Sequence, residues 1–423
     1  MKREDNERLM YAGPGTPMGR MLRQYWVPVI HGSKLERDGA PLRVKLFNQD
    51  FVAFRATDGR VGFVDEACPH RGVSLALGRN ENNGLSCIFH GWKRDVTGAV
   101  VDAPCEPRER REAFCKSIRV NRYAVRETAG VIWVYLGEGE APPFPDFEFT
   151  KLAPEQVEMR RSLVPYNWLQ GVEAHIDSSH VPILHRGFLE QEKAGLDPAI
   201  RDALAKMMHD TSPRFETDET AYGLREGALR NLGEGKTYAR IREMVLPFYT
   251  FIPGAFQGAC HGRISVPVDD DNSAEWYILY DPAKPLAEDE KRSMFMNGAD
   301  DPDDFAANLG TRDTLWGQDR QAMKTGHYSG LTRNIPFEDF IVQASMGSRL
   351  DRTQEQLGSA DVILVKVRRL LLEGLRKFEA GEGAPWRGDF NYAGIRARGI
   401  VYDASTTWRD YSWQGKKSER VTA

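Results

Sequence analysis

Two pairs of cysteine and histidine in the first quarter of the chain restrict its possible fold more than any other feature. Cys68 and His70 form a Cys-x-His pair, and Cys87 and His90 form a Cys-x2-His pair after a gap of sixteen residues. Two thiolates with two imidazoles can hold one tetrahedral zinc ion, or a 2Fe–2S cluster in which histidines replace two cysteines on one iron. Structural zinc sites usually pair cysteine with cysteine and histidine with histidine. The mixed pairs, each followed by a glycine, therefore favour the iron–sulfur cluster.

The composition indicates an ordinary globular protein, with no sign of nucleic-acid binding or of a membrane span. The 423 residues suffice for two or three domains, and the formal net charge of −4 shows no basic excess. No apolar run is long enough to span a membrane, and the charged N-terminus lacks the apolar core of a signal peptide. Cys105, Cys115 and Cys260 fit no disulfide framework. We therefore expect a cytoplasmic protein with free thiols.

Strand and turn patterns place both cysteine–histidine pairs in a small β domain. Residues 1–25 predict a helical lead-in that is interrupted by a glycine- and proline-rich run. The predicted strands are residues 42–47, 51–55, 61–64 and 131–136. Asp58-Gly59 is a hairpin signal between two of these strands, and the proline-rich run at 141–146 indicates a boundary. We predict a β domain over residues 26–140 and a second, larger domain over residues 150–423.

A second group of potential metal ligands lies in the larger domain. Residues 167–185 contain three of the nine histidines: His175, His180 and His185. Helical spacing would put Glu173, Asp177 and His180 on one helix face. Pro182 would then interrupt the helix, so that His185 can turn towards His180. Two histidines and one distant carboxylate would form the 2-His-1-carboxylate site of non-haem Fe(II) oxygenases. The alternative is a polar helix whose histidines are only hydrogen-bonded.

With both motifs the chain resembles the Rieske non-haem iron oxygenases, from Tyr25 to Asp361. It is most similar to the large (α) subunits of the phthalate 4,5-dioxygenase branch. Further segments that carry the resemblance are residues 13–19, 176–180, 343–347 and 351–358. Phenoxybenzoate dioxygenases and O-demethylases of lignin-derived biaryls share this resemblance, so it does not identify the substrate. The resemblance implies an α+β fold: a small all-β Rieske 2Fe–2S domain, then a larger catalytic domain with an antiparallel β-sheet flanked by helices.

The resemblance also implies ligand roles. The residues that would hold the 2Fe–2S cluster are Cys68 and Cys87 on one iron, and His70 and His90 on the other. The residues that would hold a mononuclear Fe(II) include His180 and His185.

Asp177 matches the aspartate that, in this family, connects an iron-bound histidine to a cluster histidine of the neighbouring subunit. A carboxylate that accepts hydrogen bonds from two imidazoles fixes the orientation of both rings. The resemblance therefore implies electron transfer between chains, in a homotrimer or in stacked trimers. An outward-facing helix-surface carboxylate is the alternative for Asp177, and Glu173 and His175 receive no definite role.

The third ligand of the mononuclear iron must come from far along the chain. The family's distal aspartate belongs to an acidic pair followed shortly by an amide, which matches Glu338-Asp339 with Gln343. We select Asp339, with Glu338 and Asp351 as alternatives. The competing interpretation is a solvated acidic pair in the first turn of a helix, where carboxylates are favoured.

Aromatic-rich segments between these sites predict strands beside an apolar pocket for a flat ring. They are residues 221–225, 238–242 and 244–253. An arginine that points inward could bind a substrate carboxylate through two hydrogen bonds, and Arg225 and Arg240 are the candidates. An outward-facing arginine in a surface ion pair is the alternative for each. This pattern favours a carboxylated aromatic substrate.

Together these features predict the oxygenase component of a Rieske-type aromatic oxygenase that uses O2. A separate reductase with flavin and iron–sulfur groups would supply electrons from NAD(P)H, because this chain has no G-x-G-x-x-G dinucleotide motif. The reaction would be ring dihydroxylation of a phthalate- or phenoxybenzoate-like acid, or O-demethylation of a methoxylated lignin-derived biaryl acid. The alternative is a Rieske-type electron carrier, which would have no use for the larger domain.

Overall fold

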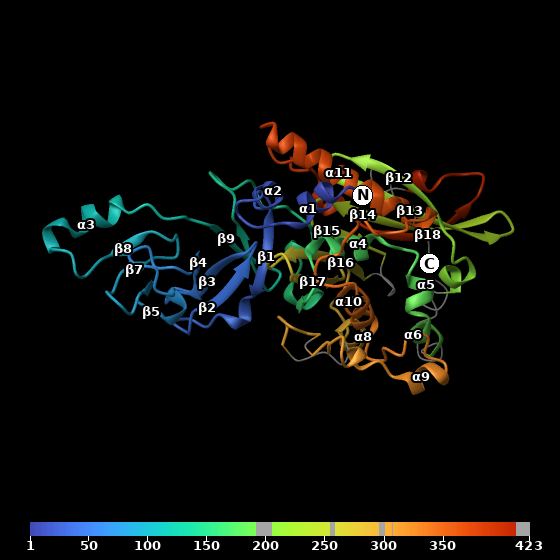
Figure 1. The fold of residues 1–423 in the computed structure, drawn as a ribbon, viewed down its shortest axis with the longest axis horizontal. Coiled ribbons are helices and arrows are strands. Elements are labelled where there is room, and N and C mark those ends of the chain that lie inside the picture. Colours follow the sequence, from blue (N-terminus) through green and yellow to red (C-terminus); the bar gives the residue numbers. More distant parts are fainter. Residues whose placement is uncertain (192–204, 254–258, 296–300, 307, 412–423) are drawn as a thin grey trace. The chain divides into compact units, whose positions relative to one another are not determined.

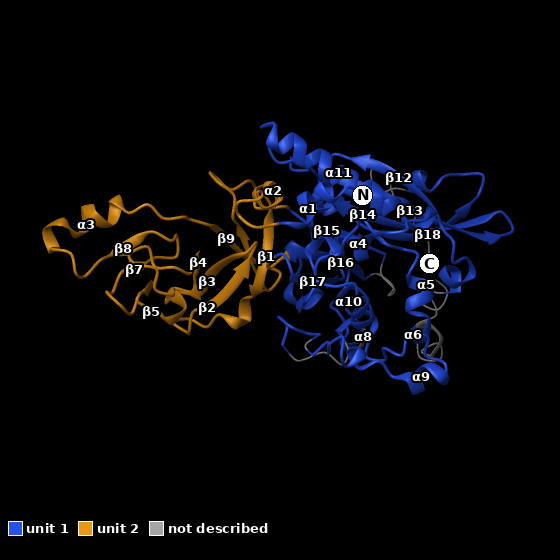
Figure 2. Cartoon of the chain, in the orientation of Figure 1, with its two compact units in different colours: residues 1–11, 146–266, 270–423 blue, residues 12–145, 267–269 orange. Residues whose placement is uncertain are grey.

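The chain divides into two compact units (Figures 1 and 2). The computed structural model describes residues 1–191, 205–253, 259–295, 301–306 and 308–411. The smaller unit consists of residues 12–145 and 267–269, and the larger one of residues 1–11, 146–266 and 270–423. Both units contain β-sheets, and most of the described helices belong to the larger unit. The predicted α+β class is confirmed.

The smaller unit is built from three antiparallel sheets. Its strands are β1 (Trp26–His31), β2 (Leu42–Leu46), β3 (Gln49–Arg55), β4 (Val61–Asp65), β5 (Arg79–Glu81), β6 (Gly84–Ser86), β7 (Lys93–Arg94), β8 (Val100–Asp102), β9 (Ala124–Thr128) and β10 (Val131–Tyr135). They pair in the orders β1-β10-β9, β2-β3-β4 and β5-β6-β7-β8. Two helices, α2 (Pro17–Leu22) and α3 (Arg108–Ser117), complete the unit. The four strands predicted in this region are all present.

The core of the smaller unit explains why its strands could be predicted from the sequence. In β2 the side chains of Val44 and Leu46 are buried, whereas those of Arg43 and Lys45 are exposed, as a period of two requires. The predicted β3–β4 turn contains Gly59 with φ of +90°, a conformation that glycine adopts readily. The core residues around the metal motif include Val52, Phe54, Val64, Leu75, Leu85 and Trp92, together with Cys68 and Cys87.

An antiparallel sheet of eight described strands forms the centre of the larger unit. The strands are β11 (Val157–Val164), β12 (Arg214–Thr220), β13 (Gly223–Gly233), β14 (Lys236–Val245), β15 (Tyr249–Ile252), β16 (Cys260–Pro267), β17 (Ser273–Tyr280) and β18 (Arg398–Asp403). Their order is β11-β17-β16-β15-β14-β13-β12, and β18 pairs with β14. The three strand segments predicted between residues 221 and 253 lie in β13, β14 and β15.

Helices pack on this sheet and carry the second motif. α4 (Trp168–Ile176) contacts β15 and β17, and α11 (Val362–Glu379) contacts β12 and β13. α10 (Ile335–Ser345) contacts both α4 and α8 (Glu288–Phe295). The short helices are α5 (Val181–Leu184), α6 (Arg186–Gln191) and α9 (Arg320–Lys324). None of the described helices is both long enough and apolar enough to cross a membrane.

The N-terminal segment, predicted as one lead-in over residues 1–25, is divided between the two units. α1 (Arg3–Met10) contacts α11 and α4 of the larger unit, whereas α2 belongs to the smaller unit. The buried Asn6 explains this division: its Nδ2 donates to the carbonyl of Leu350 at 3.1 Å, and its Oδ1 accepts from Nη1 of Arg352 at 3.1 Å. These contacts are formed with residues more than 300 positions away, so local sequence does not reveal them.

Candidate metal centres

The two cysteine–histidine loops of the smaller unit repeat one backbone pattern. In the first loop the N–H of Cys68 donates to the carbonyl of Val73, and the N–H of Gly72 donates to the carbonyl of Cys68, both at 2.8 Å. The second loop repeats this, with Gly91 donating to the carbonyl of Cys87 at 2.9 Å. Gly72 and Gly91 have φ values of +77° and +73°, which favour glycine. The glycines after each pair therefore let the backbone bend around a bound group.

The side chains of these loops bring two thiols and two imidazoles close together. Cys68 and Cys87 are free and only 3% exposed, and the rings of His70 and His90 lie 4.6 Å apart. Burial raises the pKa of the Cys68 thiol, and the adjacent Cys87 raises it further. Nδ1 of His90 is buried and makes no hydrogen bond to a described residue. Since buried polar atoms normally have a partner, this nitrogen and the two thiols fit the ligands of a 2Fe–2S cluster.

The second motif does not form the single helix that its spacing predicted. α4 ends at Ile176, because Asp177 adopts extended backbone angles of −76° and 117°. α5 begins only after His180, and Pro182 lies in its first turn, where proline is compatible with a helix. The predicted helix break at Pro182 is therefore wrong. The break lies between Asp177 and His180, and His185 follows the last residue of α5.

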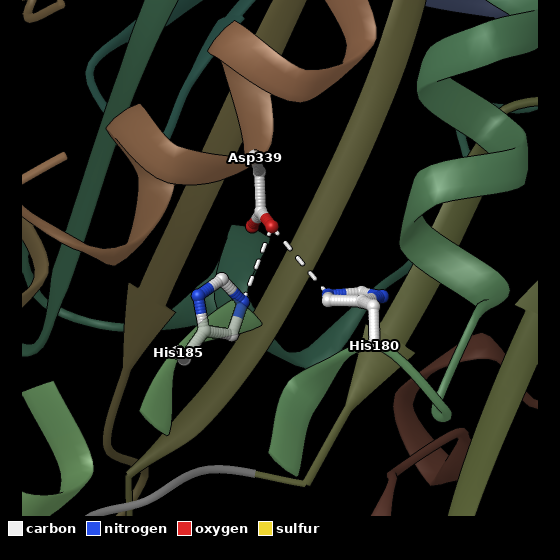
Figure 3. Close-up of side chains that lie close together, drawn as sticks. All are labelled: His180, His185 and Asp339. Atoms are coloured by element: carbon white, nitrogen blue, oxygen red, sulfur yellow. Dashed lines mark ion pairs between the residues drawn. The ribbon is translucent and has the colours of Figure 1, made fainter. Parts of the chain in front are cut away.

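His180 and His185 converge with Asp339 of α10 (Figure 3). Nε2 of His180 is 3.4 Å from Oδ1 of Asp339, and Nε2 of His185 is 3.2 Å from the same oxygen. One candidate ligand atom from each residue lies within 4.8 Å of the others. Two imidazoles and one carboxylate are the donor set of non-haem Fe(II) sites that keep open positions. These three residues therefore fit a mononuclear iron.

Each of these histidines also contacts a second carboxylate through its other ring nitrogen. Nδ1 of His180 lies 3.1 Å from Oδ2 of Asp177, and Nδ1 of His185 lies 2.6 Å from Oε2 of Glu338. Burial alone would lower the pKa of His180, but hydrogen bonds to Asp177 and Asp339 outweigh it and raise the pKa to about 9. Carboxylates in such positions commonly orient metal-binding imidazoles.

Neither of the two alternatives for the third ligand lies between the Nε2 atoms of the two histidines. Glu338 contacts the Nδ1 edge of His185, on the other side of the ring from Asp339. Asp351 is exposed, and its Oδ1 accepts from the backbone and the hydroxyl of Thr353. Burial would raise the pKa of Asp339, yet the two histidines hold it well below its usual range. Asp339 is thus the carboxylate that lies between both Nε2 atoms.

Each part of the chain matches a known protein domain. Residues 25–124 match the Rieske [2Fe-2S] domain, and residues 134–423 match the family described as LigXa C-terminal domain like. The oxygenase subunit of phthalate 4,5-dioxygenase from Pseudomonas putida is 35% identical over 423 residues, covering 96% of this chain and 94% of that protein. The chain belongs to the Rieske oxygenase family.

Two further proteins resemble this Rieske oxygenase. The oxygenase subunit of 5,5'-dehydrodivanillate O-demethylase from Sphingobium sp. is 29% identical over 394 residues, covering 90% of this chain and 81% of that protein. Among solved structures, the carbazole-bound oxygenase of carbazole 1,9a-dioxygenase, in a complex with ferredoxin, has a TM-score of 0.57 at 18% identity. It covers 91% of this chain and 96% of that one, and shows the same fold. A simple electron carrier would not contain the matched domain over residues 134–423, so that alternative does not hold.

The two arginines predicted to bind substrate lie on opposite faces of the central sheet of this Rieske oxygenase. Arg225 faces Glu243 across the strands, and its Nε donates to Oε1 of Glu243 at 2.7 Å. Successive strand residues point to opposite faces, so Arg240 and Arg242 share one face and Glu243 lies on the other. Nη1 of Arg242 donates to the carbonyl of His175 in α4 at 3.0 Å, which places Arg240 on the face that α4 covers. Arg225 is ion-paired with Glu243 on the far face, away from α4.

Arg240 has charged and titratable neighbours on β16 that the sequence analysis missed. Burial, followed by repulsion from Arg242, lowers the pKa of Arg240 to about 10. Burial also lowers the pKa of His261 well below its usual value, and the nearby Arg263 and Arg240 add to this effect. The charge of Asp339 in turn acts on Arg263. Among the described residues, Arg240 forms no ion pair with a carboxylate. The sequence signal for these neighbours is weak: His261 and Arg263 lie two residues apart in one strand and so share a face of the sheet.

Glu173 and His175, for which no role was predicted, hold α4 in place. Glu173 is buried and accepts from Nη2 of Arg352 at 2.8 Å and from Nε of Arg368 at 2.6 Å. Nε2 of His175 lies 3.1 Å from Oε2 of Glu275 on β17. Removing one partner of a buried ion pair leaves an uncompensated charge, which is strongly destabilising. The ion pairs of Glu173 therefore fix the helix that ends immediately before the iron-site motif.

Proposed function

We propose that this chain hydroxylates a carboxylated aromatic compound, either by ring dihydroxylation or by O-demethylation. The observation that carries the proposal is the convergence of His180, His185 and Asp339 in the domain that also contains Arg240. When bound by these residues, Fe(II) would supply the O2 chemistry that the protein side chains lack. The residues that would hold the 2Fe–2S cluster are Cys68, His70, Cys87 and His90.

We further propose that Asp177 connects the two metal sites across a subunit boundary. Its Oδ2 lies near His180, and its Oδ1 accepts from the N–H of Ser179 at 2.7 Å. The Asp177 side chain is 30% exposed, which leaves room for another donor. A hydrogen bond from the partner subunit's His90 would orient both imidazoles and join the two sites. This role requires an oligomer, for which a homotrimer or stacked trimers are the proposed forms.

Electrons would come from a separate protein, as in the ferredoxin complex of the related carbazole oxygenase. We propose that this chain is cytoplasmic and that a reductase with flavin and iron–sulfur groups oxidises NAD(P)H to supply its electrons. The reductase would bind the smaller unit, which contains the residues proposed to hold the 2Fe–2S cluster.

Arg240 is the residue proposed to bind the substrate's carboxylate. Arg240 is half-buried, and a partly buried cation without a counter-charge is unfavourable, whereas a carboxylate can pair with a guanidinium through two hydrogen bonds. The position of Arg240 on the α4 side of the sheet supports this role. The two curated relatives are named for phthalate and dehydrodivanillate, which are both aromatic acids.

Replacing Arg240 with glutamine should raise KM for an aromatic acid by about tenfold or more, because loss of one partner of a buried charge pair costs about 2–5 kcal/mol. Steady-state kinetics with the acid and with its neutral methyl ester would measure the effect. The ester should show little change, and Arg225→Gln should leave KM for the acid near that of the wild type. An equal loss for acid and ester would contradict the carboxylate contact.

A single-turnover assay tests the proposed function directly. The protein would be chemically reduced, freed of reductant, and mixed with O2 and with phthalate, phenoxybenzoate or a methoxylated biaryl acid. A diol product would show dihydroxylation, and formaldehyde would show O-demethylation. Oxidation of the reduced protein without any oxygenated product from all three acids would contradict the proposal.

A further inference from the structure

Glu338 is a buried carboxylate that contacts the candidate metal site without lying among its ligand atoms. Its Oε2 lies 2.6 Å from Nδ1 of His185, and the Glu338 side chain is 0% exposed. The neighbouring Asp339 contacts Nε2 of the same ring at 3.2 Å. The two nitrogens of an imidazole lie on different edges of the ring. Adjacent residues of α10 thus hold one histidine from both edges.

The second carboxylate oxygen of Glu338 also accepts a hydrogen bond. The hydroxyl of Ser329 donates to Oε1 of Glu338, and the N–H of Leu331 donates to the Ser329 hydroxyl oxygen at 3.0 Å. Ser329 is buried and lies in the segment between α9 and α10. This chain of hydrogen bonds fixes the carboxylate relative to the backbone, so Glu338 cannot turn away from His185 without breaking it.

The charges around Glu338 also indicate a site for a metal ion. Among the described residues, neither lysine nor arginine pairs with Glu338, and its partners are Ser329 and His185. A fully buried carboxylate is costly unless it is paired or lies near a bound metal. Here two consecutive carboxylates, Glu338 and Asp339, adjoin one imidazole, so a divalent cation at the Nε2 edge would compensate their charge.

We propose that Glu338 is a positioning residue for the mononuclear iron site, an inference that rests on the proposed function. By accepting the Nδ1 proton of His185 in a hydrogen bond, Glu338 selects the tautomer whose Nε2 lone pair faces Asp339. The hydrogen bond also raises the basicity of the ligand nitrogen. Ser329 holds Glu338 in the orientation that this requires. Asp177 makes the equivalent contact with the more exposed His180, so the two histidines are oriented by different carboxylates.

Glu338→Gln tests the proposal while keeping the side chain's size. Loss of such a partner typically lowers metal affinity by about 10–100-fold, and we expect a loss in that range for Fe(II). Equilibrium dialysis of the iron-depleted mononuclear site against Fe(II) measures the affinity. Electron paramagnetic resonance of the Fe(II) site with nitric oxide as a probe measures its symmetry, which should also change. The visible absorbance of the 2Fe–2S cluster should stay that of the wild type.

Glu243→Gln is the matched control, because the Glu243 side chain is also buried, at 3% exposed, and accepts from the Tyr222 hydroxyl on the sheet face away from α4. It lies outside the candidate metal site and should leave the Fe(II) affinity near that of the wild type. Ser329→Ala, which leaves the carboxylate in place, should weaken Fe(II) binding in the same direction and decides the matter if Glu338→Gln does not fold.

Wild-type affinity and an unchanged resonance spectrum in Glu338→Gln, or in Ser329→Ala if that variant must decide, would overturn the positioning role alone. If the wild-type protein itself binds no iron beyond that of the cluster, both the positioning role and the proposed function fail.

Discussion

Replacing His180 with alanine should remove the mononuclear iron and abolish formation of oxygenated product. His180 provides one of only two imidazoles in the group with Asp339, at 3.4 Å from its carboxylate. One imidazole and one carboxylate are too few protein ligands for a stable 2-His-1-carboxylate site. Bound iron should fall from about three to about two per chain, because the 2Fe–2S cluster lies in a separate unit and keeps its two irons.

Metal analysis and the visible spectrum of the cluster measure both parts of this prediction. His209→Ala is the matched control, since His209 is exposed and lies outside the candidate ligand group. It should keep about three irons per chain. If His180→Ala retained both the wild-type iron content and product formation, the assignment of the mononuclear site would be wrong.

Asp177→Asn should retain both metal centres and yet slow product formation by at least about 10–100-fold. The side chain keeps its size, and its single amide oxygen can still accept from either His180 or Ser179. It loses the negative charge that would hold two imidazole N–H groups in the proposed connection between subunits. The structural contacts of Asp177 within one chain are therefore preserved better than its role between chains.

Stopped-flow absorbance of the reduced cluster, in the presence of O2 and substrate, measures the expected defect as slow reoxidation. Asp319→Asn is the control, because the exposed Asp319 caps α9 through two backbone N–H groups and asparagine caps equally well. Reoxidation and turnover at the wild-type rate in Asp177→Asn would exclude the bridging role.

Much of this architecture follows from local sequence patterns. The short strands of the smaller unit alternate clearly, and the glycines of the metal loops occupy conformations that few other residues tolerate. Each loop needs only a few consecutive residues to form its backbone pattern. The resemblance to a known family then selected Asp339, more than 150 positions from His185, which no spacing rule could have provided.

Contacts that depend on tertiary packing could not be predicted in this way. The helix containing Glu173 ends at Ile176 instead of continuing to Pro182, because the chain turns there to bring His180 and His185 onto Asp339. Arg225 was a plausible substrate residue until its position on the far face of the sheet was known.

The contact of Glu338 with His185 joins residues 153 positions apart, and its acidic-pair pattern indicated only a possible ligand. Local patterns report which residue types are present, whereas the direction of each side chain depends on the assembled sheet and helices.

The ratio of iron to acid-labile sulfide in the purified, iron-reconstituted protein tests the central claim most directly. A chain with both a Rieske cluster and a mononuclear iron site should contain about three irons and about two sulfides. About two irons with about two sulfides, after reconstitution with Fe(II), would contradict the claim that His180, His185 and Asp339 form an iron site.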